Sequence, residues 1–382
     1  MRIEPFSLRL SSPLNTARAE LLDREGFLVG LDPDVDTGVT SSGVGEATPI
    51  PGWTESAADC EQALREIGPV KSHGNAVDGI KDGGSGHDGI TALATLDPEE
   101  TPAARHGVAL ALADADARDR NVPLAERLAD RAGLPAPSTS VPVNATIGDG
   151  DVATAVETAE RAVDDGYSCL KLKVGARPID DDIERLRAVR RAVGPAVELR
   201  ADANGAWSRK TARRALNRLR RVDLAYVEQP LPAADLDGLA RLREECRVPI
   251  AVDESLSTVA VSDVLAAEAA DVVVLKPMAL GGPMETLAAA CRAREAGVDP
   301  VITTTIDGVV ARVGAVHIAA AVPDVGACGL ATGSLLAEDL APDPSPVEDG
   351  TIEVPEGPGL AGGRFDDALD VESNDAANGR ES

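Results

Sequence analysis

The chain has 382 residues, 43% of them hydrophobic and 2% aromatic, and it carries a formal net charge of −27. A surface this acidic argues against nucleic acid or an anionic membrane as a partner. The sequence has no apolar run long enough to span a bilayer. At this length two domains are expected.

The first third of the chain predicts a mixed α+β unit. Short apolar runs separated by glycine and proline turns over 6–10, 26–31 and 40–47 predict a meander of strands. Apolar residues at helical spacing over 55–67 and 104–119 predict the helices that follow it.

Two segments differ from this pattern. Residues 72–89 are rich in glycine and charge and are interpreted as a loop insertion, with a role in oligomer contacts or substrate access left open. Residues 366–382 contain few apolar side chains and are predicted to be a disordered acidic tail.

From Val141 onward, apolar strand candidates alternate with helical stretches. Helices are predicted over 151–166, 180–194 and 283–297, with acids near their starts and basic residues farther along, as the helix dipole favours. The eight strand candidates are 141–147, 168–174, 197–203, 224–229, 249–254, 271–277, 299–305 and 326–332. This repeated order predicts a parallel (β/α)8 barrel of the TIM type.

Lysine is scarce, and half of it lies at predicted strand ends. The chain has 6 lysines against 31 arginines, yet Lys171 and Lys173 share the string CLKLKVG and Lys276 lies in VLKPM. Lysine can give up its proton where arginine cannot, so chemistry that moves a proton would retain lysine. We interpret these three residues as catalytic.

Acidic residues end the strand candidates between those lysines. They are Asp202 in LRADANGAW, Glu228 in YVEQP, and Asp253 with Glu254 in AVDES. The steps from Lys171 through Asp202, Glu228 and Asp253 to Lys276 are 31, 26, 25 and 23 residues, close to one strand-helix unit. Because the carboxyl ends of barrel strands meet at one mouth, these side chains are predicted to form one site.

The residue types indicate proton abstraction next to a carboxylate. Three carboxylates without histidine or cysteine form a hard oxygen site suited to Mg²⁺, with Mn²⁺ as an alternative. A cation there can hold a substrate carboxylate and offset the charge that develops when the neighbouring carbon loses its proton. Lys173 and Lys276 would flank the metal from opposite sides of the mouth, with the charge of Lys171 nearby.

At this point the motifs resemble a known family. The K-x-K pair, the D-A-N, E-Q-P and D-E-S strings and the later K-P resemble the muconate-lactonising subgroup of the enolase superfamily, most closely the o-succinylbenzoate synthases. The resemblance covers nearly the whole chain. It implies an α+β capping domain over 1–138, a barrel over 139–340 and a C-terminal segment over 341–365 that returns to the cap. It also places residues 14–18 in a loop that closes over the barrel mouth.

The resemblance assigns roles to the strand-end residues. The implied Mg²⁺ ligands are Asp202, Glu228 and Asp253. Lys173 resembles the base and Lys276 its cationic partner, while Glu254, Asn204 and Arg200 resemble residues beside the ligands or the substrate. The implied reaction is the syn-dehydration of 2-succinyl-6-hydroxy-2,4-cyclohexadiene-1-carboxylate to o-succinylbenzoate through an enediolate, a carbon–oxygen lyase step towards menaquinone.

The substrate is less well defined than the half-reaction, because other members of this subgroup share the same acids and lysines. Thr304 and Thr305 in TTTIDG resemble a string that holds a succinyl carboxylate in the synthases, although an ordinary polar strand end fits too. Gly281 and Gly282 either let backbone amides approach substrate or form a loop turn. Arg200 is equally plausible as a surface residue.

The same residues also bear on three alternatives to the synthase. An N-succinylamino acid racemase shares every catalytic residue and stays open. A dipeptide epimerase is disfavoured. The resemblance implies that those enzymes bind the substrate ammonium group with a D-x-D motif, and CGLATGSLLAEDL lacks it. A catalytically silent barrel is disfavoured by the retention of scarce lysines.

Composition also suggests where the chain works. The acidity and the arginine-over-lysine bias are typical of an intracellular protein adapted to high salt, which screens charge repulsion. The cysteines are scattered, odd in number and without C-x-x-C spacing, and are interpreted as buried apolar residues in a reducing cytoplasm: Cys60, Cys169, Cys246, Cys291 and Cys328. The first ten residues show no secretory signal, which also favours the cytoplasm. A small-molecule carboxylate is the expected partner, and an oligomer is possible.

Overall fold

The computed structural model describes residues 1–15, 20–33, 41–67 and 93–369. Three predictions therefore lie wholly or largely outside the described residues: the insertion at 72–89, the closing loop at 14–18 beyond residue 15, and the tail at 366–382 beyond residue 369.

An antiparallel sheet forms the N-terminal unit, which comprises the described residues up to 132. Its strands are β1 (Arg2–Asn15), β2 (Glu20–Leu31) and β3 (Gly43–Ala47), in that order. Its helices are α1 (Ala57–Glu66), α3 (Pro102–Asp119) and α4 (Leu124–Ala132). The meander and both helices predicted for this region are present.

Glycine lets α3 approach β3 closely. A Cβ atom on Gly45 would lie 2.0 Å from the carbonyl oxygen of Gly107, and one on Gly43 would lie 2.1 Å from that of Ala111. No side chain fits in that space. The buried Glu55 carboxylate then accepts from the backbone amides of Ala103 (3.0 Å) and Ala104 (2.8 Å) at the start of α3.

A curled sheet of seven parallel strands follows. In spatial order the strands are β5 (Ala145–Ile147), β6 (Cys169–Lys173), β7 (Glu198–Asp202), β8 (Tyr226–Glu228), β9 (Ile250–Val252), β10 (Val272–Leu275) and β11 (Asp299–Ile302). Nearly all of their apolar side chains are fully buried, as expected for parallel strands covered on both faces.

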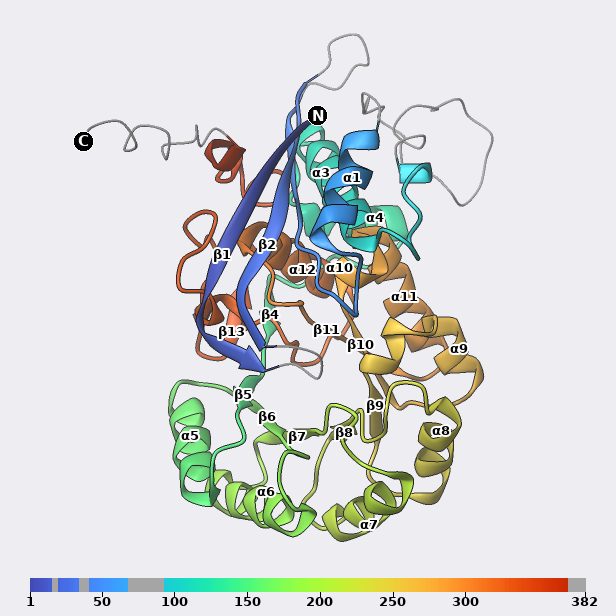
Figure 1. The fold of residues 1–382 in the computed structure, drawn as a ribbon. Helices are drawn as coiled ribbons and strands as arrows, with labels where there is room; N and C mark the ends of the chain where they lie inside the picture. Colours follow the sequence, from blue (N-terminus) through green and yellow to red (C-terminus); the bar gives the residue numbers. More distant parts are fainter. Residues whose placement is uncertain (16–19, 34–40, 68–92, 370–382) are drawn as a thin grey trace, which may run out of the picture.

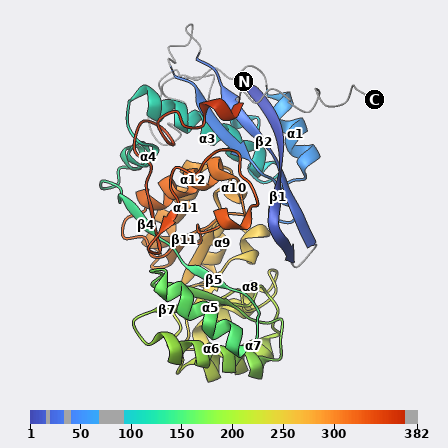
Figure 2. The same cartoon turned by 90° about the vertical axis from the view of Figure 1, so that its left-hand side faces the viewer.

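Helices connect these strands and cover the outside of the sheet. They are α5 (Val152–Asp164), α6 (Ile179–Val193), α7 (Arg209–Leu219), α8 (Leu236–Glu245), α9 (Val261–Ala266), α10 (Pro277–Leu280), α11 (Pro283–Glu295) and α12 (Val309–Ala321). The N-terminal unit lies against the α10–α12 side, and α5 to α8 lie at the opposite end (Figures 1 and 2).

The two ends of the predicted strand set differ from expectation. The 141–147 candidate divides into β4 (Ser140–Pro142), which pairs antiparallel with β13 (Thr351–Glu353), and β5. The 326–332 candidate forms no regular strand. It makes two isolated parallel bridges, Val143 with Cys328 and Thr303 with Gly329, which join the two edges of the sheet. The two glycines within 326–329 disfavour an extended strand there.

The C-terminal segment returns to the N-terminal unit. After β12 (Val347–Glu348) and β13, the amide of Leu360 donates to the buried Asp114 carboxylate on α3 (2.7 Å). A 3₁₀ helix, η3 (Asp366–Leu369), then places the side chain of Leu369 against Gly30 of β2. The prediction of a disordered tail from residue 366 is therefore wrong for 366–369, because these residues form a helix whose Leu369 side chain is a buried apolar anchor.

Two smaller expectations can be compared with the structure. No helix among the described residues is long and apolar enough to cross a membrane. All five cysteines are free, but Cys246 and Cys291 are only half-buried, so the expectation of uniformly buried cysteines is wrong for these two.

Candidate active site

The ends of five adjacent strands bring the predicted acids and lysines together. Lys173 ends β6 and lies in register with Asp202 at the end of β7, which in turn lies in register with Glu228 at the end of β8. Asp253 follows β9 directly, and Lys276 follows β10. In strand order the two outer lysines thus bracket three carboxylates at one mouth.

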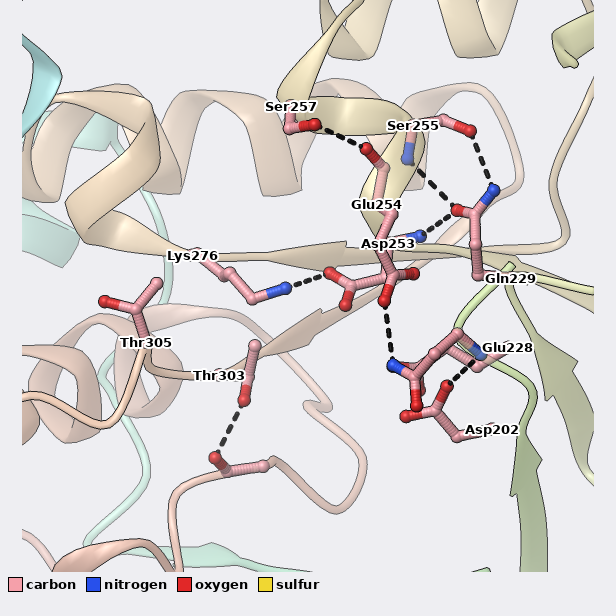
Figure 3. A network of polar contacts seen from close by, with 12 residues as sticks. Asp202, Glu228, Gln229, Asp253, Glu254, Ser255, Ser257, Lys276, Thr303 and Thr305 are labelled. Atoms are coloured by element: carbon pink, nitrogen blue, oxygen red, sulfur yellow. Dashed lines mark hydrogen bonds and ion pairs between the residues drawn. The ribbon is translucent and has the colours of Figure 1, made fainter. Parts of the chain in front are cut away.

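Each of these carboxylates is paired with a lysine. The Nζ atom of Lys171 lies 3.2 Å from Asp202 Oδ2 and 3.1 Å from Glu228 Oε1. Lys173 donates to the same Asp202 oxygen at 2.7 Å. Lys276 donates to Asp253 Oδ1, as Figure 3 shows. Each lysine Nζ atom is therefore in direct contact with at least one of the three acids, so binding of a cation by the acids would change the electrostatic environment of the lysines.

Burial and neighbouring charges set the pKa values of the acids. Burial raises the pKa of Asp202, but Lys171 and Lys173 outweigh it and hold that pKa below its usual range. Burial, reinforced by the charge of Asp202, raises the pKa of Glu228 to about 7. Burial raises the pKa of Asp253 to about 6, although Lys276 opposes this. Burial and mutual repulsion thus disfavour full ionisation of Glu228 and Asp253, so a cation bound among these acids would favour their charged forms.

Lys171 is held as a cation. Burial lowers its pKa, but the charges of Glu228 and Asp202 outweigh burial and hold the pKa well above its ordinary value. Its position between two acids makes it a fixed positive charge rather than a group that exchanges protons. The expectation that it acts alongside Lys173 stays a prediction.

Asn204 and Glu254 extend the site beyond the three acids. Asn204 has a left-handed backbone (φ 43°), and its side chain accepts from Lys173 Nζ (3.0 Å) and donates to Glu254 Oε1 (2.8 Å). The other oxygen of Glu254, Oε2, is buried without a hydrogen-bond partner. Burial and the charge of Asp202 raise the pKa of Glu254. An unpaired carboxylate oxygen of this kind is a ready partner for a cation.

Two residues that the sequence analysis did not single out also shape the site. The ring centroid of Trp53 lies 3.5 Å from the Nζ atom of Lys276, a cation–π contact made by a loop of the N-terminal unit. Gln229 accepts from the amides of Asp253 (3.0 Å) and Ser255 (3.1 Å), which fixes the turn after β9 (Figure 3). Two features of the sequence could have pointed to them. Trp53, in IPGWTES, is one of only 2 tryptophans in the chain, and Gln229 directly follows the predicted ligand Glu228.

A buried ionic cluster joins the Trp53 loop to the loop after β11. Arg24 donates to the carbonyl oxygens of Pro49 (3.1 Å) and Ile306 (3.1 Å). Glu46 accepts from the amides of Gly308 (2.7 Å) and Ala311 (2.9 Å) at the start of α12. Burial, with a further contribution from Asp307, raises the pKa of Glu46 to about 7. The N-terminal unit therefore holds one wall of the mouth in place.

The proposed substrate contacts after β11 are occupied by the protein itself. The hydroxyl of Thr305 donates to Asp307, and its amide also donates to that carboxylate (3.3 Å). The hydroxyl of Thr304 lies 3.0 Å from that of Thr332. Both threonines are buried. A succinyl carboxylate would have to displace these partners, so this arrangement favours the ordinary polar strand end.

Gly281, Gly282 and Arg200 also have internal partners. The φ values of Gly281 (78°) and Gly282 (145°) form the turn between α10 and α11, and a Cβ on Gly282 would lie 2.8 Å from Cβ of Ala109 on α3. The loop-turn interpretation is therefore the better one. Arg200 is buried, stacks 4.9 Å from the Tyr226 ring centroid and donates to the carbonyl of Ala327 (2.8 Å). It closes the barrel wall, so the expectation of surface exposure is wrong, whereas a place beside the ligands or the substrate stays a prediction.

The donor set fits a hard divalent cation. Within the part of the chain that the structure describes, no three acidic, histidine or cysteine side chains converge as a ready ligand set, because lysines lie between them. The acids nevertheless supply only oxygen donors, and with Glu254 counted they outnumber the lysines by one. They also include the unpartnered Glu254 Oε2. Mg²⁺ is the common cation for such a set, and rotation of the lysines away from the acids would free the ligands.

A parallel barrel with acids and lysines on successive strand ends defines a class of proton-abstracting barrel enzymes. Residues 154–366 match the family described as enolase C-terminal domain-like, which is more than half of the chain. The chain belongs to the enolase superfamily, in its muconate-lactonising subgroup.

Three known proteins illustrate the similarity. The chain is 43% identical over 221 residues to an o-succinylbenzoate synthase of Thermobifida fusca (strain YX), covering 56% of this chain and 66% of that protein. It is 32% identical over 335 residues to muconate cycloisomerase 1 of Rhodococcus opacus, covering 85% and 84%. The structure of a Methylococcus capsulatus dipeptide epimerase complexed with Mg and the dipeptide L-Arg-D-Lys matches with a TM-score of 0.79 and 26% identity, over 94% of this chain and 98% of that one.

Proposed function

We propose that this chain is an Mg²⁺-dependent o-succinylbenzoate synthase. It would convert 2-succinyl-6-hydroxy-2,4-cyclohexadiene-1-carboxylate to o-succinylbenzoate, a syn-dehydration in menaquinone biosynthesis. The observation that carries the reaction type is the bracketing of Asp202, Glu228 and Asp253 by Lys173 and Lys276 at one mouth. The substrate is supported by the 43% identity to the Thermobifida synthase, although that match covers only part of each chain.

The carboxylates of Asp202, Glu228 and Asp253 would hold the Mg²⁺ ion. When bound, the ion supplies positive charge that holds the substrate carboxylate and offsets the charge that develops beside it. Asn204 would keep Glu254 and Lys173 oriented, since it contacts both side chains. Lys171 would keep its charge throughout, because Glu228 and Asp202 hold it as a cation.

Lys173 would act twice on the same face of the substrate. As a neutral amine it takes the proton from the carbon next to the carboxylate, and the electron pair stays on the substrate. The carbon–oxygen bond to the hydroxyl then breaks, Lys173 returns the proton to the departing oxygen, and water leaves as the ring becomes aromatic. With 36% of its side chain exposed, Lys173 is open enough to meet a substrate at the mouth.

Lys276 would remain protonated and face the developing negative charge. Its Nζ atom is paired with the Asp253 carboxylate and lies over the Trp53 ring, two contacts in which lysine takes part as an ammonium group. The variant Lys276→Arg separates the two roles that this residue could have, because arginine keeps the charge but does not exchange protons. Residual dehydration with complete loss of any racemisation would support the electrostatic role.

The alternative is an N-succinylamino acid racemase, and the presence of a lysine on each side of the acids favours it as the second candidate. A racemase removes a proton from one face and returns one on the other, which needs two lysines that exchange protons. Turnover of the cyclohexadiene and of N-succinylamino acids in deuterated water distinguishes the two. Rapid loss of the diene absorbance with negligible deuterium in the amino acids supports the synthase. Deuterium exchange into the amino acids without dehydration would show that the proposed substrate is wrong, while the proposed catalytic residues would stand.

A further inference from the structure

A fully buried ion pair on α6 is hydrogen-bonded to the backbone at Lys173. The side chains of Asp182 and Arg185 are each 1% exposed, and Arg185 Nη1 lies 3.0 Å from Asp182 Oδ1. The same Nη1 atom donates to the carbonyl oxygen of Lys173 at 2.9 Å. Arg185 Nη2 donates to the carbonyl oxygen of Gly148, just past β5, at 2.5 Å. One guanidinium therefore holds the ends of two neighbouring strands.

Asp182 is also hydrogen-bonded to the backbone after β6. Its Oδ2 atom accepts from the backbone amide of Gly175 at 2.7 Å. The pair thus fixes the carbonyl of Lys173 and the amide two residues later, on either side of Val174. Gly175 has a left-handed backbone (φ 96°), so the chain turns sharply at this point.

Stability alone does not account for such a pair. Replacing a buried ion pair by apolar side chains of similar size is often neutral or stabilising, because two desolvated charges cost much of what their attraction supplies. The Nε atom of Arg185 is also buried without a hydrogen-bond partner. What the pair does supply is geometry, since a forked guanidinium fixes two carbonyl groups relative to one carboxylate.

Geometry matters at Lys173 because its Nζ atom has two defined partners. It lies 2.7 Å from Asp202 Oδ2 and 3.0 Å from Asn204 Oδ1. The long lysine side chain has many rotamers, so its tip meets both partners only when the backbone from which it extends is held at the right place. A displacement of about 1 Å at a reacting group can cost about 100-fold in rate.

We propose that Arg185, held by Asp182, is a positioning residue that sets the place of the Lys173 amine. The proposal rests on the role of Lys173 as the base in the proposed function. Arg185 acts through the backbone of Lys173 and of Gly148. Its loss should lower kcat and leave KM little changed, because the substrate contacts stay in place.

The test compares Arg185→Met with a matched control, Arg118→Met. Arg118 also pairs with a wholly buried aspartate, Asp114, but in the N-terminal unit on α3. Besides kcat and KM, the readout is the NMR spectrum of protein labelled with ¹³C at the lysine ε-carbon, with and without Mg²⁺. The chain has only 6 lysines, and Lys173→Ala assigns the signal of interest.

Arg185→Met is expected to lower kcat by about 10- to 100-fold and to shift or broaden the Lys173 signal, while the Lys276 signal stays unchanged. Arg118→Met should lower the melting temperature and change neither kcat nor the Lys173 signal. An unchanged Lys173 signal together with an unchanged kcat in folded Arg185→Met overturns the proposal.

A second variant covers the case in which Arg185→Met does not fold. Arg185→Lys keeps a charge beside Asp182 but cannot fork between the two carbonyl groups. Wild-type kcat and a wild-type Lys173 signal in this variant also overturn the proposal. The NMR readout needs no turnover, so a wild-type protein inactive on both substrates refutes the proposed function, whereas a moved Lys173 signal still supports the positioning role.

Discussion

The buried His317 on α12 should make the protein lose stability as the pH falls. Its side chain is fully buried, its Nδ1 atom accepts from the amide of Ala125 (3.1 Å), and its Nε2 atom donates to the carbonyl of Leu360 (2.8 Å). Both ring nitrogens are therefore satisfied only in the neutral form. A second proton on Nδ1 would face the Ala125 N–H donor without an acceptor.

The size of the effect follows from the pKa of His317. Burial lowers this pKa from 6.5 to about 4 in the folded protein. Between these values the unfolded chain binds more protons, so the contribution is complete above about pH 6.5 and is lost as the pH falls towards 4. The free energy of unfolding should decrease by about 2 kcal/mol between about pH 7.5 and pH 5, and by about 3 kcal/mol near pH 4.

Urea unfolding of the wild type and of His317→Asn across this range measures the effect. The asparagine can still accept from Ala125 but does not titrate, so the variant should be less stable near neutral pH and should lose less stability on acidification. Other buried acids titrate in both proteins and cancel in the difference. Parallel curves for the two proteins would refute this reasoning.

Three further predictions concern the site, the salt response and the packing of the fold. Lys173→Ala should abolish dehydration with Mg²⁺ affinity nearly intact, whereas Asp202→Asn should weaken Mg²⁺ binding as well; calorimetric titration and turnover check both, and near-normal turnover of Lys173→Ala would remove it as the base. The melting temperature should rise from dilute buffer to molar KCl, because salt screens the net charge of −27; a flat response contradicts adaptation to high salt. Gly45→Ala should unfold the N-terminal unit or cost several kcal/mol, because its Cβ would meet the Gly107 carbonyl at 2.0 Å, whereas Gly326→Ala has open space and should be near neutral in the same melting assay.

The spacing of titratable residues made the centre of the site predictable. Because parallel strands repeat at a near-constant interval, residues at strand ends such as Asp202 and Glu228 had to meet at one mouth once the barrel was inferred. Only local periodicity was needed for that step. The residue types then indicated which metal and which half-reaction to propose.

Contacts between distant segments were not predictable in this way. Trp53 reaches Lys276 from another part of the fold, and no local pattern encodes that approach. The sequence predicts that Thr305 faces a substrate, but its hydroxyl donates a hydrogen bond to Asp307. The turn between them includes Ile306, whose backbone is left-handed (φ 62°). The last strand failed for a similar reason, since its bridges depend on tertiary closure rather than on its own sequence.

The return of the C-terminal segment has a consequence for how the chain is made. Leu360 donates to Asp114, and Leu369 covers Gly30 of β2, so the N-terminal unit completes its packing with residues more than 240 positions later in the chain. During synthesis these two contacts cannot form until residues 360 and 369 have left the ribosome. Contacts of such long sequence separation slow folding. A chain truncated before residue 360 would leave the Asp114 carboxylate without its Leu360 partner, so late truncation should destabilise the N-terminal unit.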